Sequence, residues 1–328
     1  MATVILSILQ QNKIRTNYLF TLDFQLKKWY IYNMLLSFYQ WLQAFVCRNL
    51  LPMGKFLSLF DITLLFRSLW QHRSLMHQLV VRNISQRYKG AFLGFFWNFI
   101  QPLMMLCVYT FVFSFVFKAR GWGGVNTYPI GAYPVIMFCG IATYNLFSDG
   151  INSSCNLIVS NPNFVKKVIF PLEILVAGQV LAVFLTGILW FLLVLAGVLL
   201  VFKTVHWTIL FFPLMLPPLF FITLGVAYFV SSLQVFLKDT RYVVTVVLQM
   251  LFYMTPIFYA QEMLPARFRI VFQLNPLARI VNGIRSVFIF GETPQWFPLA
   301  VTYLISLAVL QLGFFWFKRT KRGFADVL

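Results

Sequence analysis

The sequence predicts an all-α integral membrane protein with six transmembrane helices, preceded by an N-terminal amphipathic interface helix. Hydrophobic residues make up 60% of the 328-residue chain and charged residues only 10%, whereas a soluble domain carries roughly 25% charged residues. Six apolar segments are each long enough to cross a hydrocarbon core of roughly 30 Å as a helix, and short polar loops separate them. Most of the protein surface is therefore expected to face lipid.

The net charge of +18 would suggest nucleic-acid binding in a soluble protein. Here the basic residues lie between apolar runs, and no RNA- or DNA-binding motif accompanies them. The positive-inside rule and the anionic lipids of the cytoplasmic leaflet explain the charge better, so we expect membrane lipids and no nucleic acid as partners. The four cysteines and three histidines are scattered, which predicts neither a disulfide framework nor a metal site.

Residues 53–89 are predicted to contain the amphipathic interface helix. One helical face is apolar and another is polar: the first carries Met76, Leu79, Val80, Ile84 and Tyr88, and the second Gln78, Arg82, Ser85 and Lys89. A basic amphipathic helix before the first span is expected to lie in the plane of the membrane surface. The alternative is a soluble helix that packs on a partner protein.

The first two predicted spans are Gly90–Phe117, which has no charged residue in 28 positions, and Ile130–Ile158. Gln101-Pro102 predicts a kink in the first span. Asp149 is the only charged residue of the second. A carboxylate within the membrane is a functional candidate by default. The frame of the span equally allows Asp149 to lie at its cytoplasmic end, and both interpretations stay open.

Four further spans complete the membrane domain at 90–317, and their ranges are Ile174–Phe202, Thr204–Leu237, Tyr242–Gln261 and Thr293–Phe317. The turn Lys203–His206 is expected to join the first two of these into a hairpin. The prolines at 213, 217 and 218 predict breaks in the second. Residues 318–328 form a basic tail.

The distribution of Lys and Arg orients the spans. With the N-terminus inside, the inside carries 19 of the 26 basic residues: eleven before Gly90, two in each of the loops at 166–167 and 238–241, and four at the C-terminus. The reverse orientation would break the positive-inside rule. Both termini are therefore predicted to be cytoplasmic.

A polar island, Ser160–Val176, lies between the second and third spans. A turn signal is followed by a short amphipathic helical pattern that Phe-Pro ends; in order, its residues are Asn161, Pro162, Asn163, Phe164, Lys166, Lys167, Val168, Phe170 and Pro171. Glu173 then stands near the start of the next helix, where a carboxylate favours the dipole. A helix at 161–170 is well placed to receive force from a soluble partner. The alternative is an ordinary basic loop.

The segment 262–292 is predicted to lie outside although it carries four arginines: Arg267, Arg269, Arg279 and Arg285. Its apolar runs are too short to span, and Asn275-Pro276 divides it. Two short re-entrant or surface helices are expected, because irregular backbone at this depth requires protein or a water-filled cavity around it. The alternative is a simple amphipathic surface loop.

No catalytic residues are predicted. The chain contains no GxxxxGK[ST], DxD, GxSxG or HExxH motif, so it is not an ATPase itself. Energy for any active transport must come from another subunit or from an ion gradient. A secondary carrier is the rival interpretation. The third, fourth and sixth spans contain no Asp, Glu, Lys or Arg, however, and Asp149 is the one candidate for ion coupling.

Six stretches follow one another in a specific order along the chain: QRYKGAFLGFFWNFIQPLM from Gln86, YPVIMFCGIATYNLFSD from Tyr133, SNPNFVKKVIFPLEIL from Ser160, FLKDTRYVVTVVLQMLFYMTPIFYAQEMLP from Phe236, NPLARIVNGIR from Asn275, and the terminal GFADVL. Together they resemble the membrane subunit of ABC-2 type polysaccharide exporters. The resemblance runs from about Met53 to the C-terminus. Residues 1–52 are thus expected to be an N-terminal extension, and one hypothesis is that Met53 is the physiological start.

The resemblance implies an ABC-2 permease-like fold that works as a homodimer with two copies of a separate cytoplasmic ABC ATPase. That partner would bind ATP and Mg, and no cofactor is expected in this chain. The implied substrate is a lipid-linked polysaccharide (O-antigen, capsule or a polyol-phosphate polymer) crossing the cytoplasmic, or inner, membrane. The alternatives are an ABC-2 exporter of drugs or lipids and, from a different class, a polytopic enzyme of lipid-linked glycan synthesis.

The resemblance also implies roles for individual residues. Residues of the polar island, together with Glu173, would couple to the ATPase, and the interface helix near the substrate headgroup would use Arg82, Arg87, Tyr88 and Lys89. Arg279 and Arg285 would form an external gate. Aromatic rings offer flat faces on which sugars can slide, so the channel candidates are Trp97, Tyr109, Tyr144, Asp149, Phe252 and Tyr253. Any single ring has the alternative of facing lipid or packing helices.

Overall fold

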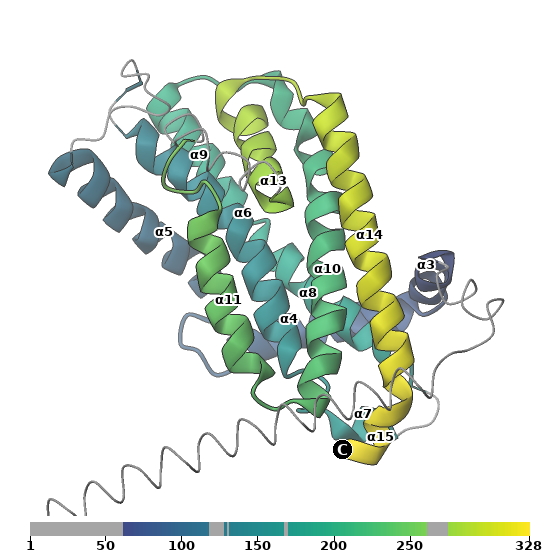
Figure 1. Cartoon of the computed structure of the whole chain (residues 1–328). Helices are drawn as coiled ribbons and strands as arrows, with labels where there is room; N and C mark the ends of the chain where they lie inside the picture. The colour runs from purple at the N-terminus through teal and green to yellow at the C-terminus, as the bar shows by residue number, and fades with distance from the viewer. Residues whose placement is uncertain (1–61, 118–127, 130, 167–169, 261–274) are drawn as a thin grey trace, which may run out of the picture. The chain divides into compact units, whose positions relative to one another are not determined.

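The computed structural model describes residues 62–117, 128–129, 131–166, 170–260 and 275–328. Every regular element within these ranges is a helix, so the all-α class is confirmed for the described part of the chain (Figure 1). The predicted extension at 1–52 lies outside the described residues. The same holds for residues 53–61, for Lys167 and Val168, and for 261–274 of the predicted external segment.

Four helical stretches of the described chain are long and apolar enough to cross a membrane. In order these are Gly94–Val116 (η1 Gly94–Phe96, α5 Trp97–Thr110 and η2 Phe111–Val116), Leu172–Phe202 (α8 Leu172–Gly187 and α9 Trp190–Phe202), Trp207–Phe236 (η3 Trp207–Phe211 and α10 Phe212–Phe236), and Trp296–Val327 (α14 Trp296–Thr320, η6 Lys321–Gly323 and α15 Phe324–Val327). They correspond to the predicted spans one, three, four and six.

Two helices occupy the other predicted spans, α6 at Ala132–Cys155 and α11 at Thr240–Met254, and neither is in that set of four. α11 has 15 residues, about 22 Å of helix, which is short for a crossing. α6 has 24 residues but carries amides, hydroxyls and Asp149. It tolerates them because α8, α9, α10, α11 and α13 surround it, so much of its surface faces protein. By length and composition, the described chain therefore has four candidate spans.

The prolines of α10 do not break it, and this corrects the sequence prediction. Pro213 lies in the first turn, where a missing N–H costs no intrahelical bond. Pro217 and Pro218 lie inside a helix that continues to Phe236. Membrane helices tolerate internal prolines when neighbouring helices pack around them. Pro102 likewise sits inside the continuous helix α5.

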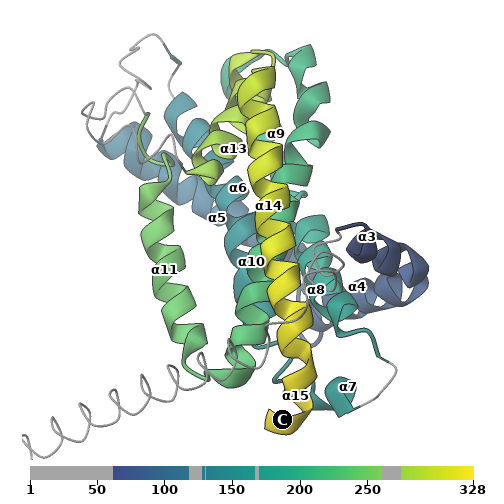
Figure 2. The ribbon, with the colours of Figure 1, turned by 45° about the vertical axis from the view of Figure 1, so that its right-hand side comes forward.

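α14 runs beside α10 in both views of the ribbon (Figure 1, Figure 2). Two glycines allow this close approach, because a Cβ added to Gly313 would lie 2.0 Å from the carbonyl oxygen of Gly225. Small residues commonly let membrane helices pack backbone against backbone. The α10–α14 pair is therefore packed backbone against backbone at these two glycines.

From residue 62 onward, where the described chain begins, two helices precede the first span, α3 at Ile62–Gln71 and α4 at Arg73–Tyr88. α4 packs on the beginning of α8, where Leu79 lies against Gly178: a Cβ on Gly178 would be 3.3 Å from the Cβ of Leu79. Leu79 and Val80 are both buried. Part of the predicted apolar face of α4 is thus covered by protein.

Candidate functional site

A polar cavity of about 590 Å³ lies where α4, α6 and α8 meet. Three elements contribute charged or amide side chains to its wall: Arg82, Asn83, Gln86 and Arg87 come from α4, Asp149 and Asn152 from α6, and Gln179 from α8. Asn161 of the polar island also lines the cavity. The cavity therefore brings together residues from the predicted interface helix, the second span and the polar island.

Arg87 and Asp149 form an ion pair across this cavity, with 3.5 Å between Nη2 and Oδ2. Their side chains are 46% and 41% exposed, so the pair contributes little to the free energy of folding. It does place two opposite charges at a fixed point of the cavity wall. Because Arg87 precedes the first span, the pair favours the interpretation in which Asp149 lies at the end of α6.

Asn98 of α5 is only 7% exposed, and its side chain forms hydrogen bonds with three other helices, α4, α8 and α9. Its Oδ1 accepts from the Tyr88 hydroxyl at 3.0 Å and from the Trp190 indole N–H at 3.4 Å. Its Nδ2 donates to the carbonyl oxygen of Thr186 at 2.9 Å. Burial raises the pKa of the Tyr88 phenol, which keeps that hydroxyl protonated as a donor. Sequence reasoning missed Asn98; the signal was an amide in an apolar span.

Within the polar island, Pro162–Lys166 form the short helix α7, and Phe164 is its packing residue. The Phe164 ring stacks on Phe170 with centroids 4.5 Å apart. The guanidinium of Arg82 lies 5.4 Å from the centre of the same ring. Asn163 and Lys166 are exposed. α7 thus packs against the rest of the chain through Phe164, while its polar side chains face outward.

Glu173 lies in the first turn of α8 and pairs with the C-terminal region of the same chain. Its Oε2 is 2.8 Å from the Nζ of Lys321, and its carbonyl oxygen accepts from the Tyr228 hydroxyl at 2.9 Å. The terminal helix α15 also lies next to α7 (Figure 2). Two stretches that the resemblance singled out, at 160–175 and at the C-terminus, therefore meet at one end of the bundle.

Tyr109 of α5 is half-buried, and four other aromatic channel candidates divide into two groups. Tyr144 of α6 is buried, donates to the carbonyl oxygen of Leu248, and packs edge-on against Phe252 of α11 with centroids 5.1 Å apart. These two rings pack helices together. Trp97 of α5 and Tyr253 of α11 are 42% and 67% exposed, so their rings are available to a ligand, to lipid or to another chain.

At the other end of the bundle, α13 runs from Pro276 to Arg285, with Asn275 as its N-cap. Arg285 is 1% exposed and donates to the carbonyl oxygens of Ile136 at 3.1 Å and Ile257 at 2.9 Å, and also to that of Pro256. Arg285 is therefore an internal tie between α13, α6 and the chain after α11.

Gly140 leaves the space that the Arg285 guanidinium fills, since a Cβ there would lie 2.4 Å from its Nη2. Arg279, the other predicted gate residue, lines a second cavity beside α13. The structure therefore separates the two arginines: one is enclosed by protein and the other borders open space.

Residues 74–289 match the family described as ABC-2 type transporter, which is more than half of the chain. The chain belongs to the ABC-2 type transporter family. The matched range begins in α4 and ends in η5 (Ser286–Phe290), so it contains the polar cavity, α7 and α13. Taken with its four candidate spans, this ABC-2 chain is a multi-pass membrane protein.

Among curated proteins, this ABC-2 chain is similar to three called "O-antigen export system permease protein RfbA". The protein from Myxococcus xanthus is 26% identical over 265 residues, which cover 80% of this chain and 98% of that protein. Two from Klebsiella pneumoniae are 27% and 25% identical over 256 residues, covering 75% of this chain and 92% of each. The similarity therefore extends over nearly the full length of these relatives.

Proposed function

We propose that this chain is the membrane permease subunit of an ATP-driven exporter that moves a lipid-linked polysaccharide across the cytoplasmic membrane. The observation that carries the proposal is the similarity to three O-antigen export permeases over 92% or more of their lengths. The family match adds support, because it includes the elements with which such a subunit would meet a partner and a substrate. O-antigen, capsule and polyol-phosphate polymers are the substrate class.

In this proposal α6 and α11 are the second and fifth of six spans, and both termini are cytoplasmic. The excess of Lys and Arg in the segments assigned to the inside supports this orientation. ATP and Mg are bound by a separate ABC ATPase present in two copies, since the sequence of this chain carries no Walker A motif. The chain itself supplies no catalytic group.

Two helices are proposed to form the contact between two copies of this chain. α5 exposes large apolar side chains along its length, continued by the first residue of η2, and α11 does so on one face: Leu103, Met104 and Val108 on α5, Phe111 on η2, and Tyr242, Val246, Met250 and Tyr253 on α11. A path between two such surfaces would be lined by Trp97, Tyr109 and Tyr253. Their flat rings offer contact without strong directional bonds to the passing sugars.

The polar cavity is proposed to receive the charged headgroup of the lipid-linked substrate. Arg82 and Arg87 line it, and the exposed Lys89 follows at the end of α4. Arginine suits phosphate because its planar guanidinium donates several hydrogen bonds at once. Movement of α7 under the ATPase would reach this cavity through the Phe164–Arg82 contact.

The proposal is tested by producing the full chain with and without its cognate ABC ATPase in a host that makes the lipid-linked glycan. A stable complex, and ATP-dependent appearance of the glycan on the outer face only when both proteins are present, are expected. Synthesis of glycan by the purified chain alone would instead support the glycan-synthesis enzyme. Export of small drugs or lipids with no effect on glycan would also contradict the proposal.

A further inference from the structure

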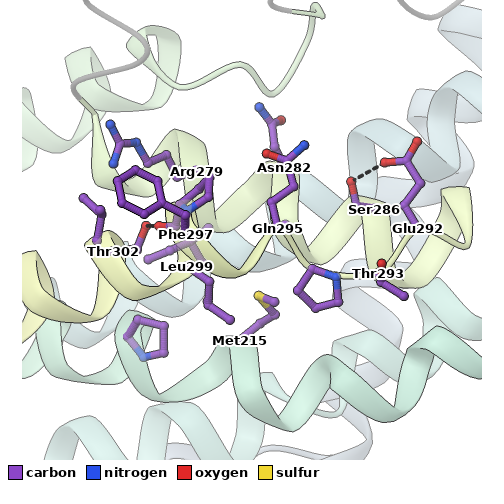
Figure 3. A pocket seen from close by; sticks show the side chains of 16 residues that line it. Met215, Arg279, Asn282, Ser286, Glu292, Thr293, Gln295, Phe297, Leu299 and Thr302 are labelled. Atoms are coloured by element: carbon purple, nitrogen blue, oxygen red, sulfur yellow. Dashed lines mark hydrogen bonds between the residues drawn. The ribbon is translucent and has the colours of Figure 1, made fainter.

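The second cavity lies among α10, α13 and α14 and has a volume of about 960 Å³ (Figure 3). We call it the wedge cavity. Its polar wall consists of Arg279, Asn282, Ser286, Glu292, Thr293 and Gln295, and its apolar wall includes Met215, Pro218, Phe297 and Leu299. The volume is in the range of pockets that bind small molecules. A space of this kind, with both polar and apolar walls, suits an amphipathic ligand.

The polar wall is a stripe along α13 and η5. Arg279, Asn282 and Ser286 follow one another at helical spacing on one face, while Leu277, Val281 and Ile284 are buried on the other. The Ser286 hydroxyl donates to Oε2 of Glu292 at 3.1 Å and holds that carboxylate at the far end of the stripe. A positive and a negative charge therefore stand at opposite ends, with the Asn282 and Gln295 amides between them (Figure 3).

Exposed tryptophans indicate the level in the membrane at which the wedge cavity lies. Trp207 and Trp296 are 67% and 61% exposed, and both contact the ring of Phe211, with centroid distances of 5.6 Å and 5.9 Å. Trp296 also stands at the start of the apolar helix α14, between two residues of the cavity wall. Exposed tryptophans at the ends of membrane helices lie at the headgroup level of the bilayer. The wedge cavity thus opens where headgroups are abundant.

The wedge cavity is separate from the proposed substrate path. Its described wall comes from α10, α13, η5, the 291–295 turn and α14, and it includes none of the channel candidates on α5, α6 and α11. The helices α10 and α14, which touch at Gly225 and Gly313, both contact α13 nearby. A ligand held here would occupy the space that α13 keeps open between them.

We propose that the wedge cavity binds the headgroup of a phospholipid that carries both a phosphate and a primary amine. The phosphate would accept hydrogen bonds from Arg279 and Asn282, and the ammonium would meet Glu292. A guanidinium has five N–H donors, so Arg279 can bind phosphate in addition to a protein group. Met215 and Leu299 supply apolar contact for the start of the acyl chains. In the proposed orientation this headgroup belongs to the outer leaflet, and that assignment alone rests on the proposed function.

The test is native mass spectrometry of the purified full chain, titrated with short-chain phosphatidylethanolamine and, separately, phosphatidylglycerol. The wild type should bind the amine-containing lipid more tightly. Arg279→Gln should weaken binding of both lipids about tenfold, because a charge-assisted hydrogen bond is lost. Glu292→Gln should remove the preference for the amine and leave binding of phosphatidylglycerol unchanged. Lys203→Gln, which removes an exposed charge outside the cavity, is the matched control.

Equal binding by the wild type, Arg279→Gln and Glu292→Gln would overturn the proposal. Competition by a soluble oligosaccharide, lost in the same two variants, would also overturn it and would assign the cavity to sugar. Lipid binding is measured without export. If the wild type shows the lipid selectivity but exports no glycan, only the proposed function fails. If it exports glycan but shows no lipid selectivity, only the wedge-cavity proposal fails.

Discussion

The guanidinium of Arg82 lies 5.4 Å from the centre of the Phe164 ring, which joins α4 to α7. A cation over an aromatic face is attracted by the ring quadrupole, and the two residues belong to helices with different proposed contacts. Arg82 lines the polar cavity, whereas α7 presents Asn163 and Lys166 outward. A displacement of α7 would therefore act directly on the Arg82 guanidinium in the wall of the polar cavity.

Phe164→Ala should weaken the complex with the ATPase and abolish stimulation of its hydrolysis by substrate. Because Phe164 holds α7 against Phe170 and Arg82, its truncation should displace the exposed side chains of α7 and cost about 2 kcal/mol, roughly a thirtyfold loss of affinity. Arg82→Gln keeps the ring but removes the contact with α4, so it should preserve the complex and lose the stimulation. Pull-down from detergent and ATPase assays measure both. Lys166→Ala, an exposed control, should change only the salt dependence. If Phe164→Ala forms the complex and exports glycan as well as the wild type does, coupling to the ATPase does not depend on α7.

Asn98→Leu should loosen α4 from the membrane helices. The substitution leaves the Tyr88 and Trp190 donors and the Thr186 carbonyl without their partner, and an unsatisfied buried group costs about 1–3 kcal/mol. We expect a lower unfolding temperature and faster hydrogen exchange in α4. Tyr88→Phe removes one of the three hydrogen bonds and should have a smaller effect of the same kind. If the two variants behave alike, Asn98 does not anchor the helix.

Most helix positions were predictable, because a chain in lipid must satisfy its backbone polar groups within helices and its apolar runs show where they lie. Pro217 and Pro218 misled the prediction for α10. The rule that proline breaks a helix describes helices in water better than helices packed among others. The length of α11 was overestimated, since apolar residues beyond Met254 continue without helix as far as Ala260.

The pairings of the site could not be predicted. Glu173 suggested a dipole interaction or a partner contact, but its cation is Lys321, 148 residues away. The hydrogen bonds of Asn98 reach residues 10, 88 and 92 positions distant. Arg285 was predicted to belong to an external gate in a segment of short re-entrant or surface helices, and only the space beside Gly140 shows why it is buried. Such contacts depend on helix packing that no local pattern encodes.

Single-cysteine labelling after removal of the native cysteines tests the orientation. Thr204→Cys and Thr293→Cys should react with an impermeant reagent added to intact cells, whereas Asn163→Cys and Asp239→Cys should react only after the membrane is opened. All four positions are exposed, so accessibility within the protein does not limit the reaction. An inverted pattern would contradict the assignment from basic residues.

Gly313→Ala should force α10 and α14 apart. The added Cβ would lie 2.0 Å from the carbonyl oxygen of Gly225, and backbone atoms cannot move aside as a side chain can. Overpacking of this kind typically costs about 1–3 kcal/mol. Gly283→Ala is the control, because its Cβ would meet the flexible Met215 sulfur at 3.3 Å. Thermal unfolding in detergent should separate the two variants, and equal midpoints would show that the helices adjust freely.

Arg285→Met should destabilise the protein more than any change at Arg279, although both arginines belong to α13. The buried guanidinium donates to three backbone carbonyls, those of Ile136, Pro256 and Ile257. Hydrogen bonds from a charged group are worth about 1.5–3 kcal/mol each, so the combined loss should exceed about 3 kcal/mol. Arg285→Lys should recover only part, since one ammonium cannot reproduce the planar fork.

Gly140→Ala provides an independent test of the same tie, because it keeps the arginine and removes its space. The new Cβ would lie 2.4 Å from Nη2 of Arg285, and the guanidinium cannot retreat without losing its carbonyls. Its unfolding midpoint should fall close to that of Arg285→Lys, while Arg279→Gln should unfold like the wild type. If Arg285→Met matches Arg279→Gln instead, the buried hydrogen bonds do not hold α13 in place. The predicted role of Arg285 at an external gate would then be the better explanation of its presence.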